Sequence, residues 1–151
     1  MEEKTLDRVV AGYIVSNYKV LLVNHKELDK WLPFGGHIEE NETPDDALRR
    51  EAKEELGIEI EFLQYPESRK GNKREYALPF YVDVHPIEEN HLHYCLFYLC
   101  KMKSRTISPN LEEINAYGWF SRENLEGSLV SKPVREACLQ AIRTIRIMRT
   151  L

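Results

Sequence analysis

The stretch GHIEENETPDDALRREAKEELGI, from Gly36 to Ile58, decides how the rest of the chain is interpreted. Its middle contains a strong helix start, because Thr43 is a good N-cap, Pro44 suits the first helical position, and Asp46 stands where a capping-box acid would. Gly57 is a natural stop, since glycine adopts the left-handed conformation of a helix end without strain. The stretch therefore predicts a helix from about Pro44 to the residue before Gly57.

Three glutamates of this helix, Glu51, Glu54 and Glu55, lie at positions i, i+3 and i+4 and so share one face. Like charges at these spacings weaken a helix slightly, and a bound divalent cation would remove the repulsion. The alternative is a solvated acidic face on which Arg49, Arg50 and Lys53 pair with the glutamates.

The surrounding residues favour the metal. The pair Gly35-Gly36 precedes the helix, and glycines let a backbone approach a ligand closely. With the acids it completes the pattern G-x5-E-x7-R-E-U-x-E-E-x-G-U, where U is aliphatic; Ala52 and Ile58 take the U positions and every specified position matches. This segment resembles the Nudix box, and the resemblance covers 23 of the 151 residues. We call Glu51, Glu54 and Glu55 the box glutamates.

The resemblance implies a fold class, α/β of mixed α+β type: a Nudix α/β/α sandwich with a mixed β-sheet and the box as loop–helix–loop. The length suits one hydrophobic core, so we expect residues 1–151 to form a single Nudix hydrolase domain.

The flanking sequence supplies elements that suit this fold. A hairpin is predicted from Val9–Val15 and Val20–Val23, and the segment with Trp31 and Pro33 is predicted to be a loop. Beyond the box we expect strands at Ile58–Leu63, Tyr76–Val84, His91–Lys101 and Ala116–Phe120, then an amphipathic helix from Lys132 onwards.

The resemblance also implies roles for individual residues. The box glutamates would bind Mg²⁺ or Mn²⁺ and take part in catalysis, and the Gly36 region would offer a backbone carbonyl to the metal. Arg50 would orient a neighbouring glutamate, and Glu42 would be mainly structural. The implied reaction is attack of water on phosphorus in a nucleoside diphosphate linked to another moiety, which includes NTPs, dNTPs, NDP-sugars and dinucleoside polyphosphates.

An acid outside the box is the candidate general base or additional metal ligand. The Nudix resemblance implies such an acid in a loop near Glu112 and Glu113, ahead of Trp119, whereas an exposed acidic loop is the competing interpretation. Glu113 is favoured because Ile114 and Tyr117 after it would anchor the loop against the sheet.

Candidate substrate contacts are Phe34 and Tyr76, which offer aromatic faces for a base, and His37 within the box loop. His91 and His93 alternate along a predicted strand and so share a face, which by itself is typical of a metal pair. Without a third ligand, we interpret them as the polar start of a strand near the substrate pocket, with His93 as a substrate contact.

Composition restricts the partners and the location. The formal net charge of −4 argues against a protein that grips long nucleic acid, so we expect a small nucleotide-like substrate. The three cysteines include no C-x-x-C pair, the N-terminus lacks an apolar signal core, and no stretch has the length of a membrane helix. We therefore expect a cytoplasmic protein that is not bound to a membrane; the oligomeric state, including a homodimer, is left open.

Two other functions compete with hydrolysis. In one, the fold is a catalytically weak nucleotide-binding or sensor module, but such proteins commonly lose box acids and this chain keeps them. In the other, the protein decaps RNA, which its acidic charge disfavours.

Overall fold

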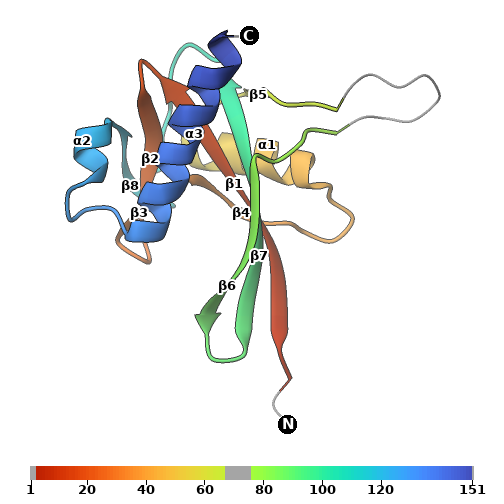
Figure 1. Ribbon diagram of the computed structural model, residues 1–151. Coiled ribbons are helices and arrows are strands. Elements are labelled where there is room, and N and C mark those ends of the chain that lie inside the picture. Colours follow the sequence, from red (N-terminus) through yellow and green to blue (C-terminus); the bar gives the residue numbers. More distant parts are fainter. Residues whose placement is uncertain (1–2, 67–75, 151) are drawn as a thin grey trace, which may run out of the picture.

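Strand β1 (Thr5–Ser16) is the centre of the fold in the computed structural model, which describes residues 3–66 and 76–150 (Figure 1). One edge of β1 pairs in parallel with β7 (His91–Met102), and the other edge pairs antiparallel with two strands. The sheet is therefore mixed, as expected. Its remaining strands are β2 (Lys19–His25) and β4 (Phe34–His37) on β1, β5 (Ile60–Phe62) and β6 (Tyr81–Glu88) on β7, and β3 (Lys30–Leu32) and β8 (Ile114–Phe120) on β2.

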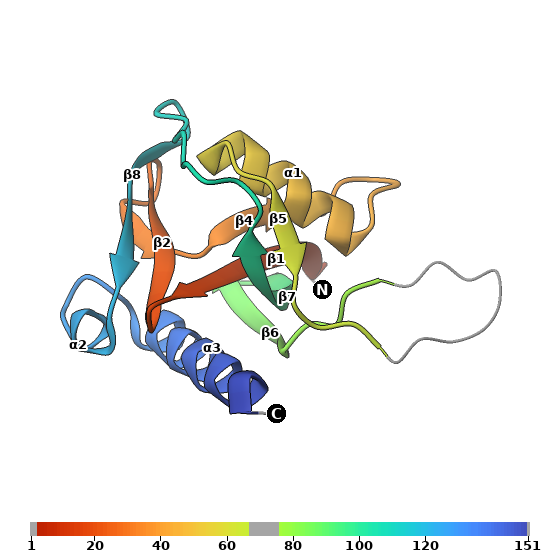
Figure 2. The same cartoon turned by 90° about the horizontal axis from the view of Figure 1, so that it is seen from above.

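Two helices cover opposite faces of this sheet, α1 (Pro44–Leu56) and α3 (Lys132–Thr150), with the short α2 (Arg122–Leu125) leading into α3 (Figure 2). Alternate residues of β1 face the two layers: Val9 packs in the cluster with α3, whereas Val10 packs in the cluster with α1. Burial on both faces explains why this strand is an unbroken apolar run. The arrangement confirms the expected α/β/α sandwich.

The ends of α1 confirm the sequence prediction. The Asp46 amide donates to the Thr43 hydroxyl over 3.2 Å, Pro44 is in the first turn, and Gly57 ends the helix with φ 62°. The Asp46 carboxylate lies 3.9 Å from Arg49. These local signals fix where the helix starts and stops, and so which face carries the acids.

The segment predicted to be a loop between the hairpin and the box contains two short strands, β3 and β4, so that prediction was wrong. Strand β4 pairs with β1 through the register Val10↔Gly36 and Ala11↔Gly35. Gly35 has φ 150°, and a Cβ there would collide with the Val10 carbonyl oxygen. Glycine ordinarily disfavours a strand, but here close packing against the central strand requires Gly35.

The strand predicted at Tyr76–Val84 begins later, as β6 at Tyr81. The residues before it contact α1 instead of extending the strand. The Ala77 amide donates a hydrogen bond of 2.9 Å to the Asp45 carboxylate, in the first turn of α1. Strand β6 continues through Pro86, where the pairing with β7 is irregular. Among the described strands β6 pairs with β7 alone, and an unpaired edge tolerates a proline that lacks an N–H.

Helix α3 starts at Lys132 as expected and packs an apolar stripe on the sheet. The buried residues of this stripe are Ala137, Cys138, Ala141, Ile142 and Ile145. All three cysteines are buried and free. Within residues 3–66 and 76–150, no helix combines the length and apolar character needed to cross a membrane.

Candidate active site

Arg50 ties the box loop to helix α1. Its guanidinium donates two hydrogen bonds to the Glu42 carboxylate, over 2.8 and 3.0 Å, and one to the His37 carbonyl over 2.9 Å. It also donates to Glu51 over 2.9 Å and Glu54 over 3.1 Å. Hydrogen bonding to Arg50 lowers the pKa of Glu42, and hydrogen bonding to Glu42 raises the pKa of Arg50. Arg50 therefore both orients glutamates and clamps the loop.

Glu55 is the most deeply buried of the box glutamates, with only 5% of its surface exposed. One carboxylate oxygen accepts a hydrogen bond of 2.9 Å from the Gly35 amide on β4. Burial raises the Glu55 pKa to about 8, although the Gly35 bond opposes this, and the nearby Glu51, Glu113 and Glu54 raise it further. In this environment a negative charge on Glu55 is destabilised by other anions and would be stabilised by a nearby cation.

The Glu51 carboxylate lies against the backbone of Gly36. A Cβ on Gly36 would collide with the Glu51 side chain, so only glycine leaves room for it. Burial raises the Glu51 pKa, and the hydrogen bond from Arg50 offsets part of that rise. Helix α1 and strand β4 thus bring carboxylates and a backbone segment together, which is the donor set that hard divalent cations prefer.

The loop carrying Glu112 and Glu113 is attached to the C-terminal end of α1. The Asn110 amide donates to the Glu55 carbonyl over 2.9 Å, and the Asn110 carbonyl accepts from the amides of Glu113 and Ile114 over 3.0 Å each. Ile114 is fully buried, as an anchor would be, whereas Tyr117 is 38% exposed. Glu113 is close enough to raise the pKa values of both Glu51 and Glu55.

A cavity of about 530 Å³ opens beside these acids, between the sheet and α3. Glu55, Gly35 and Gly36 form part of its wall, and α3 contributes Val134 and Gln140. Most of the remaining wall is apolar or aromatic: Val9, Val10, Ala11, Tyr13, Val23, Leu28, Leu32, Tyr81, Cys95 and Phe97. A few polar groups on an apolar wall are typical of a small-molecule site.

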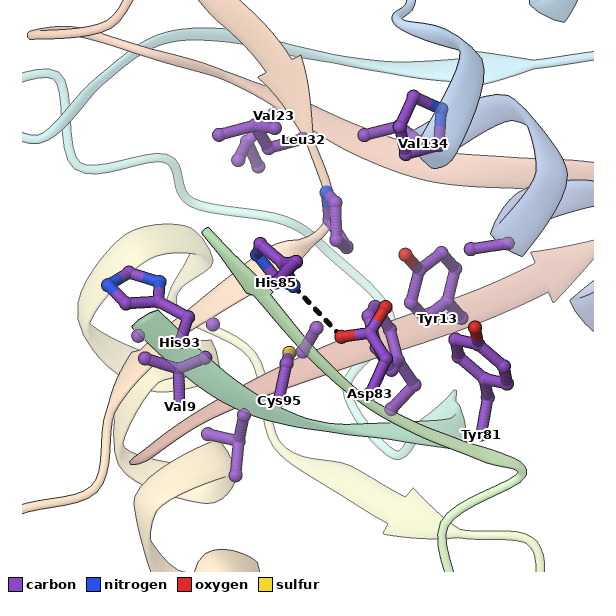
Figure 3. A pocket seen from close by; sticks show the side chains of 18 of the residues that line it. Val9, Tyr13, Val23, Leu32, Tyr81, Asp83, His85, His93, Cys95 and Val134 are labelled. Atoms are coloured by element: carbon purple, nitrogen blue, oxygen red, sulfur yellow. Dashed lines mark hydrogen bonds and ion pairs between the residues drawn. The ribbon is translucent and has the colours of Figure 1, made fainter. Parts of the chain in front are cut away.

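Polar side chains of β6 and β7 gather on one side of this cavity (Figure 3). Asp83 and His85 are joined by a contact of 2.9 Å between carboxylate and imidazole, and His93 lies beside them, with its ring centroid 5.9 Å from that of His85. Burial and neighbouring histidines lower the His93 pKa. On another part of the wall, the buried Nδ1 of His25 has no hydrogen-bond partner within the described chain.

The structure brings some predicted substrate contacts to the cavity and leaves others away from it. His37 and His93 are on its wall. Phe34 is fully buried in the core cluster beneath α1, and Tyr76, although 38% exposed, is not among the lining residues. The aromatic character of a residue does not by itself show whether its side chain lies in the core or in the pocket. Tyr13 and Tyr81, which do line the cavity, were not selected from the sequence, because only sheet pairing brings them together.

Asp7 was also missed by sequence reasoning. Its carboxylate lies 2.7 Å from His91, 3.3 Å from His37 and 3.9 Å from His93, measured to the imidazole nitrogens. The hydrogen bond from His91 is the main cause of a lowered Asp7 pKa. A single acid in a first strand carries no sequence signal for this contact, which depends on the parallel pairing of β1 with β7.

Comparison with known proteins identifies the family and agrees with the fold. A profile described as the NUDIX domain matches residues 6–138. The chain resembles a NUDIX-family hydrolase structure from Clostridium perfringens, with 28% identity, a TM-score of 0.77 and coverage of 92% of this chain and 97% of the other. A MutT NUDIX hydrolase structure from Burkholderia pseudomallei shares the fold, with 22% identity, a TM-score of 0.71 and coverage of 91% and 98%.

A curated relative is similar over a shorter stretch. The chain is 35% identical over 65 residues to an 8-oxo-dGTP diphosphatase from Proteus vulgaris, a match that includes 40% of this chain and 57% of the relative.

Proposed function

This chain belongs to the Nudix hydrolase family, and from that premise we propose that it hydrolyses a phosphoanhydride bond in a nucleoside diphosphate linked to another moiety, using Mg²⁺ or Mn²⁺. One observation carries the proposal: the box glutamates and Glu113 converge beside a cavity of about 530 Å³ whose wall includes Glu55 and Gly36. Acids clustered at the edge of an apolar cavity suit a ligand that has an apolar part and an anionic part.

Three features support a cation among the box glutamates. Glu55 is buried with a raised pKa, Glu51 lies against Gly36, and the charges of Glu54 and Glu113 contribute to the raised pKa values of Glu51 and Glu55. A divalent ion held by these residues would polarise a phosphoryl oxygen and lower the pKa of the attacking water. Arg50 would keep Glu51 and Glu54 in position, through the hydrogen bonds it already makes with both.

The cavity wall suggests how a substrate would be oriented. The exposed ring of Tyr81 offers a surface for a nucleoside, with the buried Phe97 and Tyr13 packed behind it, and the Asp83–His85 pair offers hydrogen-bonding groups to the edge of the base. The phosphates would then lie toward Gly36 and the box glutamates, with His37 and His93 as further contacts. Phe34 has no exposed surface for such a role.

We assign the general base to Glu113. Its loop is hydrogen-bonded to the end of α1 through Asn110, and its charge acts on Glu51 and Glu55. Glu112 is not among the groups that raise those pKa values. A carboxylate in that position is suited to accept a proton from water as it attacks phosphorus.

A substrate panel tests the proposed reaction. Purified protein with Mg²⁺ is assayed for release of phosphate, pyrophosphate or nucleoside monophosphate from 8-oxo-dGTP, unmodified NTPs and dNTPs, NDP-sugars and dinucleoside polyphosphates. The similarity to an 8-oxo-dGTP diphosphatase is the reason to include the first of these. We expect turnover of at least one class, its loss with excess EDTA, and its loss in Glu54→Gln. Nucleotide binding without turnover of any class would instead support a binding or sensor module.

A further inference from the structure

Three of the five histidines of the chain gather around one aspartate, and His85 lies beside one of them, with the ring centroids of His85 and His93 5.9 Å apart. The Asp7 carboxylate has imidazole nitrogens of His91, His37 and His93 at 2.7, 3.3 and 3.9 Å. The His93 ring is 5.1 Å from the His91 ring and 5.4 Å from the His37 ring, between centroids. We call Asp7, His37, His91 and His93 the histidine cluster.

The sheet holds this cluster from three strands. In the parallel ladder of β1 with β7, Asp7 is the partner of His93, and Thr5 is the partner of His91. Strand β4 ends at His37, which pairs with Val9 on the other edge of β1. Ligands on paired strands are held more rigidly than ligands on loops, so the arrangement is preorganised by main-chain hydrogen bonds.

The separations suit a metal ion. One ligand atom from each of Asp7, His91 and His93 can be chosen so that all lie within 4.8 Å of one another. Tetrahedral zinc with bonds of about 2.0–2.1 Å requires ligand atoms about 3.4 Å apart, so small side-chain adjustments suffice. The contact of 2.7 Å between Asp7 and His91 would lengthen as both turned to the ion.

We propose that Asp7, His91 and His93 bind a transition-metal ion of the Zn²⁺ class, with His37 or a water as the fourth ligand. Imidazole is a preferred ligand of zinc, copper and nickel, whereas magnesium prefers oxygen, so this site and the box glutamates would select different ions. Three protein ligands with an open fourth position are typical of an accessible zinc site rather than a closed structural one.

Exposure and location agree with an accessible site. The His93 side chain is 19% exposed, those of His91 and Asp7 about 30%, and that of His37 62%. His37 and His93 also line the cavity. The ion would therefore lie at the cavity wall, where an anionic part of a ligand could take its open position. The proposal does not depend on the hydrolytic function, because it concerns metal binding by the protein alone.

Metal binding with matched variants tests the proposal. Protein stripped of metal is titrated with Zn²⁺ in a large excess of Mg²⁺, which occupies oxygen-rich sites, and binding is followed by calorimetry. We expect one zinc per chain. His91→Asn, His93→Asn and Asp7→Asn should each weaken zinc binding by at least ~100-fold, since even loss of an outer-shell partner costs about 10–100-fold. Cobalt bound in place of zinc should give the intense visible absorption of a tetrahedral site.

Two controls separate this site from others. His25→Asn removes a histidine outside the cluster and should leave zinc affinity unchanged. Glu54→Gln should also leave it unchanged, although it should lower the rate of the proposed hydrolysis by at least ~100-fold. Thermal unfolding of each metal-free variant verifies its fold, and the three cluster variants test the site independently if one of them unfolds. Zinc affinity that is absent in the parent protein, insensitive to all three cluster variants, or lost in Glu54→Gln would overturn the proposal.

Discussion

At the scale of single residues, Arg50 and Glu55 show how differently two charged side chains are accommodated in one site. Arg50 has hydrogen bonds to Glu42, Glu51, Glu54 and the His37 carbonyl. Glu55 is more deeply buried, and its carboxylate accepts a hydrogen bond from the Gly35 amide. The hydrogen-bonding groups of Arg50 are therefore satisfied within the protein, whereas the Glu55 carboxylate is arranged to bind a further group.

Replacing a box glutamate by glutamine should affect turnover far more than folding. Glu54→Gln and Glu55→Gln remove a negative charge and little volume, and each should lower kcat by a factor of at least ~100, as expected for loss of a main electrostatic contributor. Steady-state kinetics with Mg²⁺ gives the result. Glu40→Gln, an exposed substitution in the same segment, is the matched control and should keep the parental rate. Near-parental rates for both box variants would mean that these two glutamates do not take part in catalysis.

The loop acids provide a second comparison between neighbours. Glu113→Gln should lower kcat more than it raises KM, because a base acts mainly in the transition state. Glu112→Gln should be milder, since Glu113 is the one whose charge acts on Glu51 and Glu55. If neither substitution changes kcat by more than about threefold, roughly 0.65 kcal/mol of barrier, the base lies elsewhere.

At the scale of elements, the end of α1 connects the box to the loop with Glu113. Gly57 ends the helix with φ 62°, and its amide donates to carbonyls of the last turn. The Ser108 amide then donates to the Leu56 carbonyl, and the Asn110 amide donates to the Glu55 carbonyl. The loop with Glu113 is thus hydrogen-bonded to the end of α1, and a change at the helix end should alter the position of the loop.

Gly57→Ala tests this connection. The backbone there is left-handed, and the new Cβ would lie 2.8 Å from the Ser108 carbonyl oxygen. We expect a loss of about 1–2 kcal/mol in the free energy of unfolding, from the strained conformation together with the steric clash. Gly127→Ala is the control, because a Cβ there meets only the Asn124 carbonyl oxygen at 3.3 Å. Chemical denaturation compares the two, and equal stabilities would show that Gly57 is not required as a helix stop.

At the scale of the whole molecule, the two helical layers leave different environments on the two faces of the sheet. The α1 face is filled by one core cluster, whereas the α3 face contains a second core cluster and most of the cavity wall. Strand β4 connects them, because Gly35 and Gly36 line the cavity while Phe34 is buried in the core under α1. Charge buried at this junction should therefore influence the stability of the entire fold.

The metal-free protein should lose stability as the pH rises from about 5 to 8. Burial raises the Glu55 pKa in the folded state to about 8, from an ordinary value of 4.5. Between these values the folded protein holds a proton that the unfolded chain releases, so higher pH favours unfolding. Urea denaturation in EDTA measures the effect, and Glu55→Gln should flatten it. Added Mg²⁺ should stabilise the protein more at pH 8 than at pH 5, because protons compete with metal for carboxylates. Equal pH dependence in parent and variant would contradict this assignment.

The sequence by itself determined the box helix and which carboxylates share one face of it. Thr43, Pro44 and Gly57 act through neighbours along the chain, so their roles follow from local rules of helix capping. The positions of Glu51, Glu54 and Glu55 on one face follow from helical geometry alone. Periodicity was equally sufficient for α3 and for most of β7, because long apolar patterns repeat a local signal.

Only the tertiary structure decided which distant residues share a site. The hydrogen bond between Asp7 and His91 joins residues 84 positions apart, through a parallel pairing that the sequence pattern does not specify. Likewise, Phe34 and Tyr81 are both aromatic, yet one is buried in the core and the other lines the cavity, because strand register and the position of α3 determine which side chain faces which layer. Side-chain type is a property of the residue, whereas its surroundings are created by packing.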